Sequence, residues 1–287
     1  MISQPGFKRR LLAALAHPDD EAFGPGGTLA LYAQRGVETY LVCATRGEAG
    51  GAPPDLRGYA SVAEMREAEL RCASRVLGLK QVRFLGYRDS GMAGSPENLH
   101  PDSTAKAPLA EIARKVAWHI REIRPQVIIT FDPSGGYGHP DHIAVHRATV
   151  EAFRLAGDPQ VEIDGLPPYS PQKLYYHTFP RRWLKPLVRL LQRVGADPQR
   201  FGRNRDIDLL ALAAGDVEVH TVIRTRSVAH LKGQAIQCHA SQNGGMPRVA
   251  IALMARLLGN KEYFSRAVPV QPPPHLERGL FEGVLEG

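Results

Sequence analysis

Two short clusters of imidazole and carboxylate side chains stand out in the sequence. They are His17-Pro18-Asp19-Asp20-Glu21 and Gly135-Gly136-Tyr137-Gly138-His139-Pro140-Asp141-His142. Both contain His-Pro-Asp, each follows an apolar run, and each places a histidine and an aspartate within three residues. Because neighbouring carboxylates repel one another, the first cluster predicts a bound cation nearby.

The residue types match a known set of metal ligands. A tight turn can aim His17 and Asp20 at one point, and His142 can approach from the second cluster. Two histidines and one carboxylate with a vacant position form the ligand set of catalytic zinc and also of non-haem iron(II). A metal there brings the pKa of its water to about 7 and polarises a carbonyl. We therefore predict a Zn²⁺ site, with Fe²⁺ as the alternative, that serves hydrolysis.

The residues beside these ligands suggest acid and base roles. Asp19 is adjacent to the ligand Asp20 and is predicted to act as the general base. We expect His139 to stabilise an oxyanion as an imidazolium, with the negative charge of Asp141 raising its pKa. Glu21 is interpreted as a capping or ion-pairing residue and stays outside the catalytic set.

The elements around the clusters predict an α/β protein. Apolar runs typical of strands lie at residues 11–16, 39–45, 82–87, 127–132 and 173–178. Helical patterns lie between them at 27–35, 61–78, 108–123 and 141–156. This alternation predicts a Rossmann-like, mostly parallel sheet with helices on both faces, whose active site lies at the carboxyl ends of the strands.

The pattern is less regular after residue 180. A strand is expected near 217–223, helices near 227–238 and 247–258, and a proline-rich tail at 268–275. Residues 1–287 are predicted to form a single domain.

A basic insertion at about 181–205 holds eight Lys or Arg against one acidic residue and accounts for the net charge of +7. Its apolar stripe at 183–194 predicts a short amphipathic helix. Three interpretations stay open: a solvated face, a helix on an anionic membrane surface, or a lid that binds an anionic group of the substrate. Nucleic acid is not an expected partner, because the basic residues are local and aromatic residues are few.

The three cysteines, Cys43, Cys72 and Cys238, are odd in number and far apart. They predict neither a disulfide framework nor a zinc ribbon, and Cys238 is interpreted as a buried thiol. A reducing cytoplasm is therefore the expected location. The basic residues 8–10 before the apolar run imitate a signal peptide, but a run of six residues is too short for one. Homo-oligomer formation stays open.

Five motifs, in order, resemble the LmbE-like, or PIG-L, family of zinc-dependent N-acetylglucosaminyl deacetylases over roughly the first 180 residues. They are Ala16-His17-Pro18-Asp19-Asp20-Glu21, Gly26-Gly27-Thr28, Met65-Arg66-Glu67-Ala68-Glu69, Arg88-Asp89-Ser90-Gly91-Met92 and Gly138-His139-Pro140-Asp141-His142. The resemblance implies a Rossmann-like fold and removal of the acetyl group from N-acetylglucosamine joined to inositol, malate or another aglycone. The basic segment 181–205 has no counterpart in that pattern.

The resemblance also implies residue roles. It makes His17, Asp20 and His142 the zinc ligands, Asp19 the base, and His139 the oxyanion or acid group with Asp141 behind it. Tyr137 corresponds to a tyrosine that assists the tetrahedral intermediate. Three further residues match substrate-facing positions: Glu48, Arg66 and Asp89. His239, in a His239-Ala240-Ser241-Gln242 element, is expected to line the pocket.

These observations predict a metal-dependent amidohydrolase that acts on a small N-acetylglucosaminyl conjugate. A bacillithiol-type or mycothiol-type precursor is the narrower expectation, and it rests on the resemblance of residues 88–92 alone. Two alternatives stay open. One is a different mononuclear metallohydrolase that acts on another N-acyl sugar or a phosphoester. The other is a non-enzymatic protein that binds anionic surfaces through residues 181–205 and keeps a structural metal.

Overall fold

A seven-stranded sheet forms the centre of the computed structural model, which describes residues 8–51, 55–56, 58–181, 184–200, 208–215, 217–242 and 260–285. Its strands are β1 (Arg10–Leu15), β2 (Glu38–Thr45), β3 (Gln81–Tyr87), β4 (Val127–Phe131), β5 (Lys173–Thr178), β6 (Thr221–Arg224) and β7 (Lys261–Val268). The spatial order is β3-β2-β1-β4-β5-β7-β6. β1 to β5 are parallel, and β6 and β7 are antiparallel additions at one edge.

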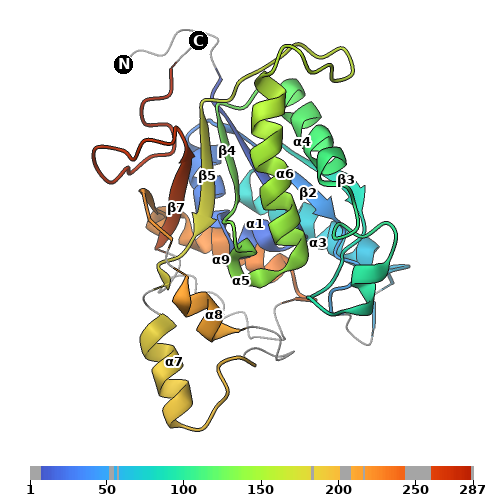
Figure 1. Ribbon diagram of the computed structural model, residues 1–287, viewed down its shortest axis with the longest axis vertical. Coiled ribbons are helices and arrows are strands. Elements are labelled where there is room, and N and C mark those ends of the chain that lie inside the picture. The colour runs from blue at the N-terminus through green and yellow to red at the C-terminus, as the bar shows by residue number, and fades with distance from the viewer. Residues whose placement is uncertain are drawn as a thin grey trace.

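Helices cover both faces of the parallel part (Figure 1). α4 (Leu109–Ile123) and α6 (Pro140–Gly157) pack together on one face. On the other face α2 (Gly26–Gln34), α3 (Val62–Leu77) and α9 (Ala229–Cys238) contact one another. Short helical segments lie between these elements: α1 (Asp20–Phe23), α5 (Gly135–Gly138) and the 3₁₀ helices at Pro96–Leu99 and Arg226–Val228. The predicted Rossmann-like class is confirmed.

The ends of the helices have local causes. The Ser61 hydroxyl accepts the Glu64 N–H to cap α3, and Gly78, at φ 75°, ends it in the left-handed region. At α2 the carboxylate of Glu262 accepts the N–H groups of Gly27 and Thr28, at 2.9 and 2.7 Å. A carboxylate therefore fills the N-terminus of α2, where the glycine-rich turn could otherwise have suggested a phosphate site.

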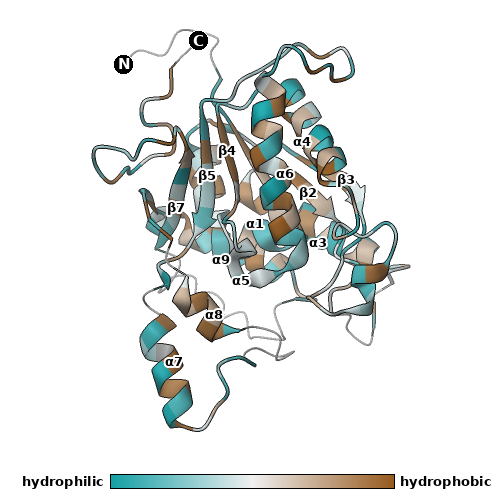
Figure 2. Cartoon of the chain, viewed as in Figure 1, coloured by the Kyte–Doolittle hydropathy of each residue, from teal (hydrophilic) through white to brown (hydrophobic). Residues whose placement is uncertain are grey.

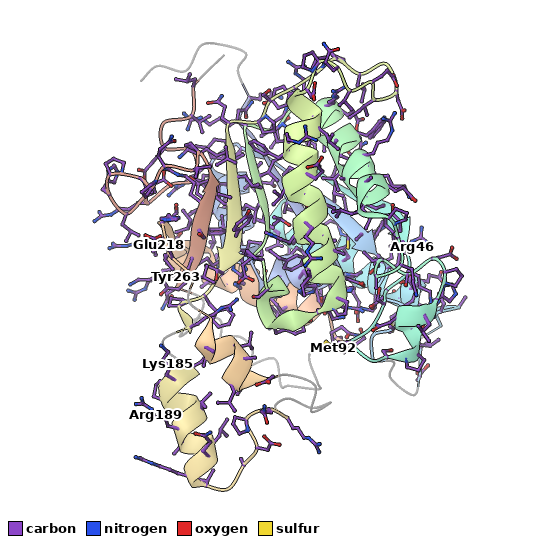
Figure 3. All side chains as sticks on the ribbon, in the orientation of Figure 1. Arg46, Met92, Lys185, Arg189, Glu218 and Tyr263 are labelled. Atoms are coloured by element: carbon purple, nitrogen blue, oxygen red, sulfur yellow. A yellow bond between two sulfur atoms is a disulfide. The ribbon has the colours of Figure 1, made fainter. Side chains whose placement is uncertain are left out.

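α7 (Leu184–Arg193) and α8 (Leu209–Ala214) project from the body of the molecule (Figure 1). Hydrophobic residues pack between these two helices, around Val188 and Leu212, in a cluster separate from the main core. The polar face of α7 carries Lys185 and Arg189, which point to solvent, whereas its apolar residues alternate with them (Figures 2 and 3). The predicted amphipathic helix is thus present. Among the basic residues of this segment that the structure describes, Arg181 is buried whereas the others are exposed.

The C-terminal part departs from the sequence expectation. Residues 261–268 form the long strand β7, for which no strand was predicted. Its residues are mostly half-buried, so it lacks the continuous apolar run that marks the parallel strands. The expected strand at 217–223 is shorter and begins at Thr221. The helix expected at 247–258 lies outside the described residues.

The cysteine prediction was wrong. Cys72 on α3 and Cys238 at the end of α9 form a disulfide, and Cys43 alone is a free, buried thiol. The two cysteines are 166 residues apart in the chain, but α3 and α9 pack side by side and bring their Cα atoms to 5.8 Å. Sequence spacing carries no information about such a pair, and the cysteine pattern no longer favours a reducing compartment.

Among the described residues, no helix combines the length and apolar character needed to cross a membrane.

Candidate active site

Loops from four parallel strands meet at one edge of the sheet. His17 follows β1, Gly47 follows β2, Asp89 follows β3, and α5 follows β4. These loops surround a cavity of about 450 Å³. Its lining residues are His17, Asp19, Ala49, Gly50, Gly51, Arg66, Asp89, Gly91, Met92, Ser95, Tyr137, His139 and Gln242. The predicted location of the site, at the carboxyl ends of the strands, is thus where the motifs converge.

The three predicted ligands form a tight triangle. Nδ1 of His17 lies 3.2 Å from Nε2 of His142. Asp20 brings Oδ1 to 3.3 Å from that Nε2 and Oδ2 to 3.6 Å from Nδ1 of His17. All three side chains are largely buried. Two imidazole nitrogens and a carboxylate in contact are the donor set that zinc or iron(II) takes.

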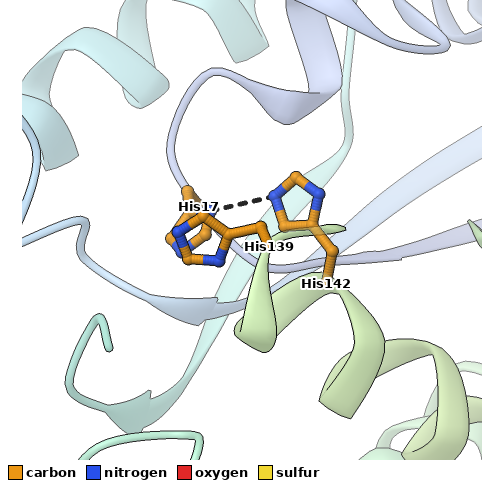
Figure 4. A group of neighbouring side chains, drawn as sticks. All are labelled: His17, His139 and His142. Atoms are coloured by element: carbon orange, nitrogen blue, oxygen red, sulfur yellow. Dashed lines mark hydrogen bonds between the residues drawn. The ribbon is translucent and has the colours of Figure 1, made fainter. Parts of the chain in front are cut away.

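Hydrogen bonds on the far sides of the rings decide which nitrogens point at this triangle. Nδ1 of His142 lies 3.1 Å from the carbonyl oxygen of Gly135, which can only accept, so this nitrogen carries a proton. Nε2 of His17 lies 3.0 Å from Oδ2 of Asp141 and donates to it. In the neutral rings, therefore, Nδ1 of His17 and Nε2 of His142 turn their lone pairs toward each other (Figure 4).

Two facing lone pairs at 3.2 Å require a positive charge between or beside them. Without a metal, a proton supplies it: although burial opposes the charged ring, Asp89, Asp141 and Asp20 raise the pKa of His17 well above its ordinary value. A divalent cation satisfies the same nitrogens and displaces that proton. The residues present therefore fit a metal.

His139 lies close enough to His17 and His142 to be considered as a third histidine ligand. Its hydrogen bond argues against that role. The Asp141 N–H donates to Nδ1 of His139 at 3.2 Å, so in the neutral ring the proton sits on Nε2. A ligand nitrogen needs a lone pair, and Nε2 instead offers an N–H donor to the cavity.

The predicted pairing of His139 with Asp141 takes a different form. The Asp141 carboxylate contacts His17 and the Ser90 N–H, and only the Asp141 backbone reaches His139. Burial, followed by the charges of His17 and His142, lowers the pKa of His139 to about 3, and the negative charge of Asp141 does not reverse this. With Nδ1 accepting the Asp141 N–H, the ring offers its Nε2–H to the cavity, and the role of His139 as an imidazolium stays a prediction from the sequence.

Asp19 occupies a strained position at the start of α1. Its φ of 129° lies in a region that side chains rarely adopt, at a cost of about 1–3 kcal/mol. The strain is held by a bond from the Asp19 N–H to Oε2 of Glu21, at 3.0 Å, and by Arg66, whose Nη2 lies 3.1 Å from Oδ2 of Asp19. Burial raises the pKa of Asp19 to about 6, with Arg66 opposing the rise. Such a value suits a general base near neutral pH.

Arg66 ties together the loops that follow β1 and β2. Its side chain is 3% exposed, and it donates to the carbonyl oxygens of Gly47 at 2.8 Å and Pro18 at 2.7 Å as well as to Asp19. A Cβ at Gly47 would lie 2.1 Å from Nη1 of Arg66, so only glycine admits the guanidinium. Arg66, predicted to face the substrate, lines the cavity, and its Nη1 and Nη2 atoms donate to Asp19 and to the backbone.

The other predicted substrate residues lie at different depths. Asp89 lines the cavity and approaches Nε2 of His17 at 3.4 Å, while its Oδ1 accepts the Gly91 N–H. Glu48 accepts the Asp89 N–H at 3.0 Å and lines a neighbouring cavity instead. Tyr137 is 39% exposed and stands at the cavity wall, with its ring centroid 5.0 Å from that of His142.

His239 does not reach the cavity. It is fully buried, and its Nε2 lies 2.6 Å from Oε1 of Glu21, the residue left outside the catalytic set. Because Glu21 also accepts the Asp19 N–H, His239 holds the carboxylate that in turn fixes the backbone of Asp19. Gln242, three residues later, lines the cavity, and its amide donates to the Gly51 carbonyl.

One buried pair beside the site was missed by the sequence interpretation. Asp132, at the end of β4, accepts the N–H groups of Ser134 and Gly136 through Oδ1 and pairs with Nη2 of Arg181 at 2.7 Å. It thereby shapes the turn that carries Tyr137. Asp132 is the last residue of the strand predicted at 127–132, and this position at a strand end was the available signal. Its partner Arg181 is 49 residues away and had been grouped with the basic segment.

The α/β fold, with a buried cluster of histidines and carboxylates at the carboxyl ends of its strands, is typical of a hydrolase. The chain belongs to the PIG-L family, described as GlcNAc-PI de-N-acetylase, whose pattern matches residues 12–153. The expected class of enzyme, a hydrolase that deacetylates an N-acetylglucosaminyl group, is confirmed by this membership.

Two relatives extend the likeness beyond the matched region. The 1D-myo-inositol 2-acetamido-2-deoxy-alpha-D-glucopyranoside deacetylase of Thermobifida fusca is 43% identical over 244 residues, 82% of this chain and 83% of its own. The protein of the same name from Kineococcus radiotolerans is 39% identical over 303 residues, 100% of this chain and 80% of its own.

Solved structures share the fold. The conserved protein TT1542 from Thermus thermophilus is 26% identical with a TM-score of 0.61, covering 92% of this chain and 97% of its own. The N,N'-diacetylchitobiose deacetylase from Pyrococcus horikoshii is 21% identical with a TM-score of 0.62, covering 96% and 86%. At that identity the second likeness concerns the fold alone.

Proposed function

We propose that this protein is a zinc-dependent deacetylase that hydrolyses the acetamide of N-acetylglucosamine linked to inositol. The observation that carries the zinc assignment is the contact between Nδ1 of His17 and Nε2 of His142, whose lone pairs face each other beside Asp20. The inositol aglycone is supported by the names of the relatives that are 43% and 39% identical. It is therefore favoured over the malate aglycone considered from the sequence.

His17, Asp20 and His142 would hold the ion, which when bound lowers the pKa of a water and polarises the acetamide carbonyl. Asp19 takes the proton of the attacking water, because its carboxylate lines the cavity and its pKa lies near 6. Arg66 and Glu21 hold that carboxylate and its backbone in place.

His139 supplies the complementary group. Its Nε2–H donates to the acetamide oxygen as negative charge develops there. The hydroxyl of Tyr137 offers a second donor from the cavity wall. The leaving amine receives the proton that Asp19 has taken up. Asp89, which also lines the cavity, presents a carboxylate that can accept hydrogen bonds from sugar hydroxyl groups.

The test is amine release from 1D-myo-inositol 2-acetamido-2-deoxy-α-D-glucopyranoside, N-acetylglucosaminyl malate and free N-acetylglucosamine, measured together with zinc content. We expect about one zinc per chain and the highest kcat/KM with the inositol conjugate. Asp19→Asn should retain zinc and lose about 10²–10⁴-fold in kcat. The matched control is Asp164→Asn in an exposed loop, which should behave as wild type.

Two outcomes would contradict the proposal. Equal turnover of the three substrates would remove the inositol assignment, and full activity after complete removal of metal would remove the zinc assignment. Location in the cytoplasm, membrane contact through residues 181–205 and formation of homo-oligomers stay predictions from the sequence.

A further inference from the structure

A second cavity, of about 550 Å³, lies at the sheet edge formed by β6 and β7. Its lining residues are Pro180, Arg181, Val217, Val219, Val222, Arg224, Lys261, Tyr263, Leu276 and Arg278. It shares no lining residue with the active-site cavity, and its volume falls within the range of about 300–1,000 Å³ typical of small-molecule sites.

The strand register explains which side chains reach this cavity. In the antiparallel pair, Val222 lies opposite Tyr263 and Arg224 lies opposite Lys261. All four line the cavity, as residues two apart on one strand face must. The intervening pair, Ile223 and Glu262, points to the other face, where Glu262 caps α2. The cavity thus lies on the face that also carries α4 and α6, but at an edge that neither helix crosses (Figure 1).

The charge around the cavity is one-sided. Arg224 and Lys261 are direct cross-strand neighbours, and like charges in that position destabilise a sheet. Both are exposed, as is Arg278, and within the part of the chain that the structure describes none of the three has an ion-pair partner. No carboxylate appears among the described lining residues. This arrangement is favourable when an anion sits between the cations.

The inner wall supplies an independent observation. Arg181 is 5% exposed, its Nη2 donates to Asp132, and its Nε has no hydrogen-bond partner among the described residues. A buried N–H without a partner costs about 1–3 kcal/mol. Arg181 lines the cavity, so its buried guanidinium forms part of the inner wall against which a ligand would pack.

The rest of the lining is apolar. Val217 and Val219 line the cavity, whereas Glu218 between them is exposed (Figure 3). Oε2 of Glu218 lies 3.4 Å from Nε2 of His220. Val222 continues this wall, and Leu276 lies at the mouth with 52% of its surface exposed. An apolar floor beneath a rim of cations fits a ligand with an apolar body and an anionic head.

We propose that this cavity binds a small amphipathic anion, with an aliphatic or aromatic body against the valines and Leu276 and a carboxylate or phosphate head between Arg224 and Lys261. The inference does not depend on the deacetylase reaction or on a bound metal, because no residue of the cavity belongs to the active site.

Isothermal titration of the full-length protein with octanoate, and with 1-octanol as the neutral analogue, tests the proposal. We expect octanoate to bind at one site and octanol at least about tenfold more weakly, since charge-assisted bonds are the stronger ones. Arg224→Gln/Lys261→Gln should weaken octanoate about tenfold or more. Val219→Trp should fill the cavity and abolish binding of both probes.

The matched control is Lys185→Gln/Arg189→Gln on α7, which removes the same charge outside the cavity and should leave octanoate binding unchanged. Thermal melting of each variant checks that it is folded. Arg224→Gln/Lys261→Gln removes charge whereas Val219→Trp fills space, so either one suffices as a test if the other fails to fold. Equal affinity for octanoate and octanol, or an equal loss in the α7 control, would overturn the proposal. Flotation with anionic phospholipid vesicles in the absence of octanoate binding would overturn it in favour of a membrane contact.

Discussion

The carboxylate of Asp141 lies 3.0 Å from Nε2 of His17, although His139 is only two residues away from Asp141 in the chain. The same oxygen accepts the Ser90 N–H, so its position is set by a loop that follows β3. Asp141 therefore decides which nitrogen of His17 faces His142 and Asp20. Its main effect is on the metal ligand, and its effect on His139 passes through the backbone.

Removing the charge of Asp141 should weaken metal binding. Asp141→Asn keeps the size of the side chain but no longer stabilises the proton on Nε2 of His17, so Nδ1 loses part of its basicity. We expect zinc affinity to fall about 10–100-fold, measured by competition with a chromophoric chelator. Asp158→Asn, at the other end of α6, is the control. An unchanged zinc affinity would show that Asp141 does not orient the ligand.

Replacing Arg66 with lysine, which has fewer hydrogen-bond donors, should impair the predicted base Asp19 without removing the metal. Lysine cannot reach Gly47, Pro18 and Asp19 at once, because it has one ammonium group in place of a planar fork. Displacement of the Asp19 carboxylate by about 1 Å can cost about 10²-fold in kcat. We expect that loss in Arg66→Lys, with zinc content and KM near wild type.

The matched variant for this comparison is Arg71→Lys on the same helix, where the arginine is exposed and pairs with Glu67. It should retain full kcat. If Arg66→Lys raised KM and left kcat unchanged, Arg66 would instead contact the substrate, as the sequence resemblance had implied.

Breaking the Cys72–Cys238 pair should lower stability. The disulfide closes a very long loop, because the cysteines are 166 positions apart in the chain, so its loss is expected to cost about 2–4 kcal/mol of unfolding free energy. Chemical denaturation with and without reductant measures this. Titration of the unfolded, unreduced protein should find one thiol per chain, that of Cys43.

The double variant Cys72→Ser/Cys238→Ser provides the control, because reductant should not destabilise it further. Since His239 directly follows Cys238 and supports Glu21, the double variant should also lose activity. Three thiols in the unreduced wild type would rule out the disulfide.

The buried carboxylate of Glu277 should make stability depend on pH. Burial opposes its ionisation, but bonds from Lys173, Thr221 and Tyr175 hold the pKa of Glu277 below its ordinary value of 4.5. A lowered pKa means that this stabilisation is complete above about pH 4.5 and is lost as the pH falls through the lowered value.

Glu277→Gln tests this directly. It leaves the buried ammonium of Lys173 without its carboxylate and is expected to cost about 3–5 kcal/mol at pH 7. The difference from wild type should shrink as the pH falls through the lowered pKa of Glu277, where the native carboxylate itself takes up a proton. Denaturation curves over that range measure it, and a difference that stayed constant with pH would contradict the assignment.

Much of the fold and of the site was predictable because it depends on short stretches of chain. Alternating apolar runs and helical patterns identified the five parallel strands, and parallel strands place their carboxyl ends at one edge. The spacing of His17 and Asp20 then sufficed to suggest a ligand pair. β7 escaped prediction because its half-buried residues carry no comparable signal.

By itself, the sequence determined the fold class, the converging motifs and the family, since each is expressed within a few tens of consecutive residues. Only the tertiary structure decided that Asp141 serves His17, that His239 stands behind Glu21, and that Cys72 meets Cys238. These contacts join residues 124, 218 and 166 positions apart. The physical reason is that such pairs are set by how the helices and loops pack on the sheet, and no local pattern of residues encodes that packing.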